Sequence, residues 1–120
     1  MKTQGLNHIQ IGVSDMDRSI AFYTHLLGMR VLFHEGMDLV FLQSGEGDDI
    51  FTLHRMDGVV DVEAGGLQHF GFAVRREDHA AAVEEARAYG AEVVGVGQHG
   101  DGALYAYIKD PNGYTIELGG

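Results

Sequence analysis

The chain has 120 residues, a length that suits one domain with a real buried core. Its net charge of −10 argues against a nucleic-acid partner, because phosphate binding needs a basic patch. There are no cysteines, no apolar run of membrane-spanning length and no signal-peptide pattern, which excludes disulfides and thiolate metal ligands and predicts a cytoplasmic protein without a membrane partner.

The first predicted strand, residues 6–13, recurs in the second half of the chain at residues 67–74. Both segments carry leucine, histidine, two large apolar residues and valine at the same five places. The copies begin 61 residues apart, so the repeat predicts two copies of one structural unit. Because each copy keeps its histidine, we expect His8 and His69 to face a shared site.

A helix is predicted after each of these strands, at residues 16–27 and 77–89. Ser14 is the expected N-cap of the first helix, and Gly28 and Gly90 end the two helices. Three short apolar runs follow each helix, at residues 30–34, 38–43 and 50–54 and at residues 92–96, 104–109 and 114–118. The chain is therefore predicted as a single domain, 1–120, of two paired modules at about 1–60 and 61–120.

Alternation of side chains along the strands separates a core face from an open face. His8 and His69 fall on the face opposite the large apolar residues of their strands. Glu117 falls opposite Ile116 and Leu118, where a carboxylate is costly without a partner. Two histidines and one glutamate on non-core faces form a credible ligand set for a divalent metal that keeps positions open for a substrate.

The paired modules, the two histidine strands and the closing D-P-N-G-Y-T-I-E-L at residues 110–118 together resemble the vicinal oxygen chelate superfamily. This superfamily includes glyoxalase I, extradiol dioxygenases, fosfomycin-resistance thiol transferases and bleomycin-resistance proteins. The resemblance covers essentially the whole chain. It implies an α+β fold of two βαβββ modules whose mixed sheets curl around a central metal site, with His8, His69 and Glu117 as its ligands. It also implies a homodimer in which modules pair within one chain or between chains.

The members differ at the last strand of the first module. Glyoxalase I would place a fourth ligand where this chain has Thr52, a poor ligand, unless the register slips and His54 ligates. Extradiol dioxygenases use three ligands for Fe(II) or Mn(II), with an acid–base histidine, a further histidine and a tyrosine nearby. His54, His99 and Tyr107 stand at about those places, and Tyr105 shares a strand face with Tyr107, so either tyrosine could be the phenol.

The prediction that follows is an extradiol-type dioxygenase with Fe(II) or Mn(II), in which His54 and Tyr107 are catalytic. The alternatives are a glyoxalase I-type lyase with zinc, nickel or cobalt, then a fosfomycin-type thiol transferase, or a metal-free binding protein of the bleomycin-resistance type. In every case the partner is a small molecule, which an enzyme of this kind would bind through neighbouring oxygens.

Aromatic residues are the candidate walls of the substrate pocket, although core packing explains the phenylalanines equally well. These residues are Phe33, Phe41, Phe51 and Tyr105. For His99, in a glycine-rich loop, simple exposure is the favoured interpretation. Three further histidines, His25, His34 and His79, are placed on helix or strand surfaces and are assigned no role.

Overall fold

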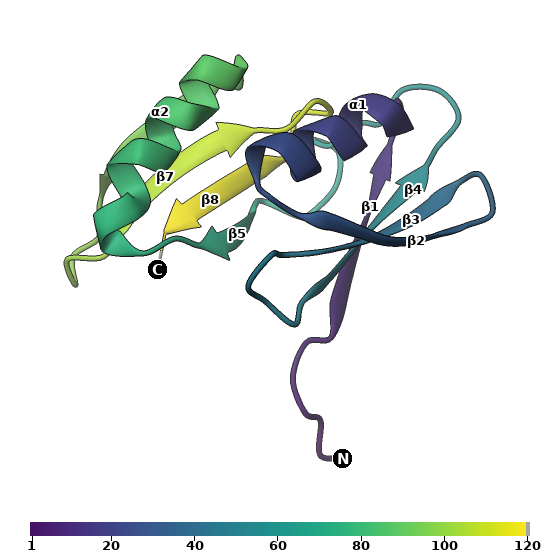
Figure 1. The fold of residues 1–120 in the computed structure, drawn as a ribbon, viewed down its shortest axis with the longest axis horizontal. Helices are drawn as coiled ribbons and strands as arrows, with labels where there is room; N and C mark the ends of the chain where they lie inside the picture. The colour runs from purple at the N-terminus through teal and green to yellow at the C-terminus, as the bar shows by residue number, and fades with distance from the viewer. Residues whose placement is uncertain (120) are drawn as a thin grey trace. The chain divides into compact units, whose positions relative to one another are not determined.

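The computed structural model describes residues 1–119 and divides the chain into two compact units, 1–60 and 61–120 (Figure 1). Each unit holds a four-stranded mixed sheet and one short α-helix, so the predicted α+β class is confirmed. The strand order is β1-β4-β3-β2 in the first unit and β5-β8-β7-β6 in the second. None of the helices in the described part of the chain is long and apolar enough to cross a membrane.

The first unit follows the predicted order of strand, helix and three strands. Its elements are β1 (His8–Val13), α1 (Met16–Ala21), the π-helical turn η1 (Phe22–Leu26), β2 (Arg30–Glu35), β3 (Leu39–Gln43) and β4 (Ile50–Arg55). β1 pairs with β4 in parallel, and the other pairs are antiparallel. Its core holds Val13, Leu42 and Leu53, all of which are fully buried.

The helix of the first unit begins at Met16 as predicted, but its N-cap residue and its second half differ from the prediction. Asp15, not Ser14, caps it, because the Asp15 carboxylate accepts a hydrogen bond from the Arg18 backbone N–H at 3.1 Å. The predicted helix is α-helical only to Ala21 and continues as the π-helical turn. This turn buries two neighbouring aromatic residues, Phe22 and Tyr23, whose rings meet edge to face.

The second unit repeats the same order. Its elements are β5 (Phe70–Ala73), the 3₁₀ turn η2 (Arg76–Asp78), α2 (His79–Tyr89), β6 (Val93–Gln98), β7 (Leu104–Lys109) and β8 (Thr115–Gly119). α2 covers one face of this sheet (Figure 1). The predicted surface position of His79 is wrong, because only 4% of the residue is exposed. His79, Val83 and Ala86 follow the i, i+4, i+7 spacing of one buried helix face.

The strand registers show that the two units are equivalent position by position. Thr52 of β4 pairs with Gln10 of β1, and Glu117 of β8 pairs with Gly71 of β5. Gln10 and Gly71 each stand two residues after the repeated histidine. Thr52 therefore occupies the place of Glu117 in its own unit. β1 and β4 pair without a shift, so no slip of register brings His54 to that place.

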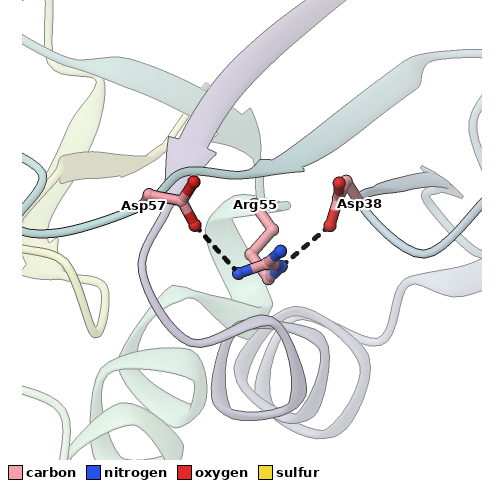
Figure 2. Close-up of polar contacts among 3 residues, drawn as sticks. All are labelled: Asp38, Arg55 and Asp57. Atoms are coloured by element: carbon pink, nitrogen blue, oxygen red, sulfur yellow. Dashed lines mark hydrogen bonds and ion pairs between the residues drawn. The ribbon is translucent and has the colours of Figure 1, made fainter.

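Arg55 at the end of β4 contacts a carboxylate in the turn between β2 and β3 and another in the segment after β4, as Figure 2 shows. Its Nε donates to Asp38 at 2.8 Å and its Nη1 donates to Asp57 at 3.3 Å. The hydrogen bond and the charge of Asp38, followed by the charge of Asp57, raise the pKa of Arg55. Because two carboxylates bind its guanidinium, Arg55 stabilises the fold. Its positive charge is largely neutralised and attracts an anionic ligand only weakly.

Thr52 offers a direct test of the packing in the first unit. Its hydroxyl is fully buried and has no hydrogen-bond partner among the described residues. Thr52→Val removes this desolvated group with little change of shape, so we expect the free energy of unfolding to rise by about 1 kcal/mol. Urea denaturation followed by circular dichroism measures this.

Thr115→Val is the matched control. The Thr115 hydroxyl accepts a hydrogen bond from Lys109 Nζ at 2.6 Å, so its loss should not stabilise the protein. A Thr52→Val protein that is less stable than the wild type would show that the threonine hydroxyl has a favourable partner.

Candidate metal centre

The sheet of the second unit has one covered face and one open face. α2 packs on the covered face, where Ile108 and Ile116 are fully buried. Alternation and register place on the open face Gly71, Gly95, Gly97, Tyr105, Tyr107, Lys109, Thr115, Glu117 and Gly119. Gly71 of β5 pairs with Glu117, and Gly95 and Gly97 of β6 pair with Tyr107 and Tyr105. The long side chains of β7 and β8 therefore have no side chain from β5 or β6 beside them at these paired positions.

Three of these glycines have close neighbours, and a Cβ atom at Gly119 would lie only 2.5 Å from the Leu104 backbone oxygen. A Cβ atom at Gly97 would lie 2.5 Å from the Tyr105 hydroxyl oxygen, because the tyrosine ring lies over this glycine. A Cβ atom at Gly71 would lie 3.1 Å from the backbone oxygen of Glu117. Glycine at these two positions allows the Tyr105 ring and the Glu117 backbone to approach as closely as they do.

Glu117 is the centre of the polar contacts on this face. Its Oε2 lies 3.2 Å from His69 Nε2, and its Oε1 lies 3.1 Å from His99 Nε2. The Tyr107 hydroxyl also hydrogen-bonds to the carboxylate. The Glu117 side chain is 22% exposed, whereas the two histidines are 42% and 45% exposed. The carboxylate thus has the partners that its position between two core residues demands.

Tyr107 keeps its proton in this arrangement. Desolvation, then the negative charge of Glu117 and the hydrogen bond to it, raise the pKa of Tyr107 above its ordinary value of 10.0. The protonated hydroxyl donates to Glu117, and the ring meets His69 edge to face with 5.4 Å between centroids. Tyr107 therefore fixes the orientation of both side chains and is a positioning residue for the pair.

His69 and Glu117 fit the requirements of a divalent ion. Two ligand atoms at about 2.1 Å from an ion and at right angles lie about 3.0 Å apart, close to the observed separation. Imidazole and carboxylate together suit first-row transition metals. Among residues 1–119, no group of three or more histidine, aspartate or glutamate side chains is arranged to hold an ion. A complete site needs a further ligand besides this pair.

His8 is the predicted ligand that belongs to the first unit. It is exposed at the start of β1, on the same sheet face as Gln10 and Thr52. Its Nδ1 is hydrogen-bonded to the Asn7 side-chain oxygen, and an acceptor on one ring nitrogen is the usual support of a metal-binding imidazole. His54 lies two residues beyond Thr52 on that face and is half-buried opposite Leu39.

His99 is the residue that the sequence interpretation undervalued. It lies in the predicted glycine-rich loop, but this loop is a tight turn in which the His99 backbone N–H donates to Ala103 at 2.8 Å. The turn returns the chain into β7, and the His99 ring lies 4.6 Å from the Tyr105 ring between centroids. The sequence alone gives little sign of this contact, because the contact depends on the geometry of the turn between β6 and β7.

The predicted aromatic walls divide between the core and the open faces. Phe51 is 4% exposed and packs against the Tyr23 ring in the core, so its assignment as a wall is wrong. Phe33 is half-exposed and stacks on Phe41, with 4.3 Å between ring centroids. Tyr105 lies on the open face of the second unit and contacts the Tyr107 ring.

Comparison with known proteins adds the family. Residues 5–118 match the Glyoxalase/Bleomycin resistance protein/Dioxygenase superfamily. A lactoylglutathione lyase of Haemophilus influenzae is 32% identical over 119 residues, which cover 92% of this chain and 88% of that protein. A lactoylglutathione lyase of Arabidopsis thaliana is 35% identical over 121 residues, but the chain spans only 42% of its length.

Solved structures share the fold at lower identity. The lactoylglutathione lyase of Agrobacterium tumefaciens superposes with a TM-score of 0.79 at 22% identity, covering 99% of this chain and 95% of that one. A fosfomycin resistance protein of Listeria monocytogenes superposes with a TM-score of 0.82 at 18% identity, covering 98% and 93%. The named relatives support the glyoxalase-type alternative better than the dioxygenase that we predicted first. The chain therefore belongs to the Glyoxalase/Bleomycin resistance protein/Dioxygenase superfamily, as the repeated histidine strands and the closing motif indicated.

Proposed function

We propose that this protein is a metal-dependent lyase of the glyoxalase I type. The observation that carries the proposal is the 32% identity to a lactoylglutathione lyase across nearly the full length of both proteins. The chemistry of the Glu117 centre supports it. Such a lyase interconverts a lactoyl thioester with a thiol and a 2-oxoaldehyde, which requires moving a proton between two adjacent carbons that each bear an oxygen.

The proposed site uses His69 and Glu117 from the second unit and His8 from a first unit, in the same chain or in a partner chain of a homodimer. A divalent ion bound there would act as a Lewis acid on the two neighbouring oxygens of the substrate. Two imidazoles and one carboxylate bind cobalt, nickel and zinc more tightly than manganese or ferrous iron, so we propose one of the first three.

His54 is the proposed acid–base group. An imidazole can take and return a proton near neutral pH, because its ordinary pKa is about 6.5. His54 is half-buried on the sheet face that also carries Gln10 and Thr52. Threonine cannot replace the carboxylate that would stand at position 52 in a four-ligand site, so this site would keep three protein ligands.

An extradiol-type dioxygenase is the second candidate. The observation that favours it is the combination of Thr52 at the fourth-ligand place with His99 and Tyr107 on Glu117. This is the three-ligand pattern with a neighbouring histidine and tyrosine that the first prediction used. Oxygen consumption with a catechol separates this reaction from the lyase reaction, which consumes no oxygen.

The ligand assignment predicts one divalent ion per chain in the wild type. His8→Ala, His69→Ala and Glu117→Ala should each weaken zinc binding by at least about tenfold, because each removes a direct ligand. Elemental analysis after dialysis and titration calorimetry with zinc measure the effect. His25→Ala, an exposed histidine of the first unit, is the control that should bind as the wild type does. A His69→Ala protein that keeps one ion per chain at wild-type affinity would refute the assignment.

The support of Glu117 by Tyr107 gives a second metal-binding prediction. Tyr107→Phe removes the hydroxyl that donates to Glu117 but keeps the ring against His69, and we expect zinc affinity to fall about tenfold. Tyr105→Phe is the matched control, since Tyr105 contacts the rings of Tyr107 and His99 but pairs with Gly119 and not with Glu117. Equal affinity in the two variants would mean that the Tyr107 hydrogen bond does not orient the ligand.

The reaction itself is tested with the nickel- or zinc-loaded protein, methylglyoxal and glutathione. We expect thioester absorbance to appear at a rate above the protein-free reaction and to fall at least about hundredfold in His54→Ala. The variant should retain its metal if His54 acts on the proton only. Oxygen uptake with catechol, without thioester formation, would replace the lyase by the dioxygenase.

A further inference from the structure

One lysine lies on the open face of the second unit, close to the metal centre. Lys109 of β7 pairs directly with Thr115 of β8, and the next pair on this face is Tyr107 with Glu117. Ile108 and Ile116, between these pairs, are fully buried on the opposite face. Two residues along a strand cover about 7 Å, which is the spacing between the lysine pair and the glutamate pair.

The Lys109 ammonium is held in place by a neutral group. Its Nζ donates to the Thr115 hydroxyl oxygen at 2.6 Å, and both residues are half-buried. This bond uses one of the three ammonium hydrogens and leaves the positive charge uncompensated by Thr115. Arg55, in contrast, is bound by Asp38 and Asp57, and Arg87 on α2 is paired with Glu84.

The negative charge of the whole chain makes a positive side chain beside the proposed site a candidate contact for an anionic group of the substrate. A net charge of −10 repels anions from most of the surface, so an anionic substrate needs a local positive group beside the site. Among the residues that the strand pairs place on the open face of the second unit, Lys109 is the one cation.

We propose that Lys109, oriented by Thr115, binds a carboxylate of the substrate about 7 Å from the centre at Glu117. This inference rests on the proposed metal site and adds the substrate class. The substrate carries two neighbouring oxygens at one end and a carboxylate at the other. Lys109 is then a specificity-determining residue that contributes to binding and takes no part in the proton transfer.

Two hydroxamic acids test this without relying on activity. Acetohydroxamic acid and the monohydroxamate of succinic acid both chelate a divalent ion through two neighbouring oxygens, but only the second has a carboxylate on a short chain. Titration calorimetry of the zinc-loaded protein gives the ratio of their dissociation constants. We expect the wild type to prefer the succinic compound about tenfold, as for one charge-assisted hydrogen bond.

Lys109→Met keeps most of the apolar stem and removes the charge, so the preference should fall to about one while acetohydroxamic acid binds as before. Lys109→Arg should keep the preference, and it serves as the second variant should the methionine protein fail to fold. Arg87→Gln removes one positive charge from α2 instead and should leave the ratio unchanged.

The outcomes separate this inference from the proposed function. A wild-type ratio near one, or an unchanged ratio in Lys109→Met, would overturn the carboxylate subsite and leave the metal site standing. A zinc-treated wild type that binds neither hydroxamic acid would overturn the metal site and, with it, the subsite.

Discussion

The organisation of the second unit depends on satisfying one carboxylate. Glu117 stands in β8 between Ile116 and Leu118, which are both buried against α2, so the alternation of the strand leaves it the open face. A partly buried negative charge is unfavourable without polar partners. His69, His99 and Tyr107 meet that demand from three different segments of the unit, and their positions follow from the position of the carboxylate.

The same face shows how a sheet makes room for chemistry without a deep cavity. Glycines in the flanking strands let the Tyr105 ring lie over Gly97 and bring the β8 backbone close to Gly71. A methyl group at Gly97 would collide with the Tyr105 ring, and one at Gly71 would make a tight contact with the Glu117 backbone oxygen. The aromatic rings of β7 thus lie against backbone on one side, which lets polar groups and rings share a small area.

Much of this architecture follows from the sequence, because it depends on local patterns. Short-range signals include the histidine repeat, the alternation around Glu117 and the glycines after the helices. They predict two units of the same build, and the two units have the same order of elements and equivalent strand orders. The alignment of Thr52 with the glutamate position also follows from counting residues along paired strands, and the register agrees with it.

The features that escaped prediction depend on longer-range packing. Asp15 replaces Ser14 as the cap because of where the first turn closes, and the π-helical turn buries two successive aromatic residues, which no simple period predicts. His79 is buried because α2 begins with it on the sheet-facing side. His99 reaches Glu117 because a tight turn joins β6 and β7, and only the paired strands define that geometry.

The equivalence of Thr52 and Glu117 has a consequence for how such proteins diverge. Both side chains occupy the same register position of the same strand, in units whose backbones follow one plan. In the proposed metal site, the number of protein ligands would therefore be set by the side chain at one position and not by a change of fold. A duplicated unit of this kind lets one half keep a carboxylate while the other half exchanges it for a neutral side chain, without any change in the pairing of the strands.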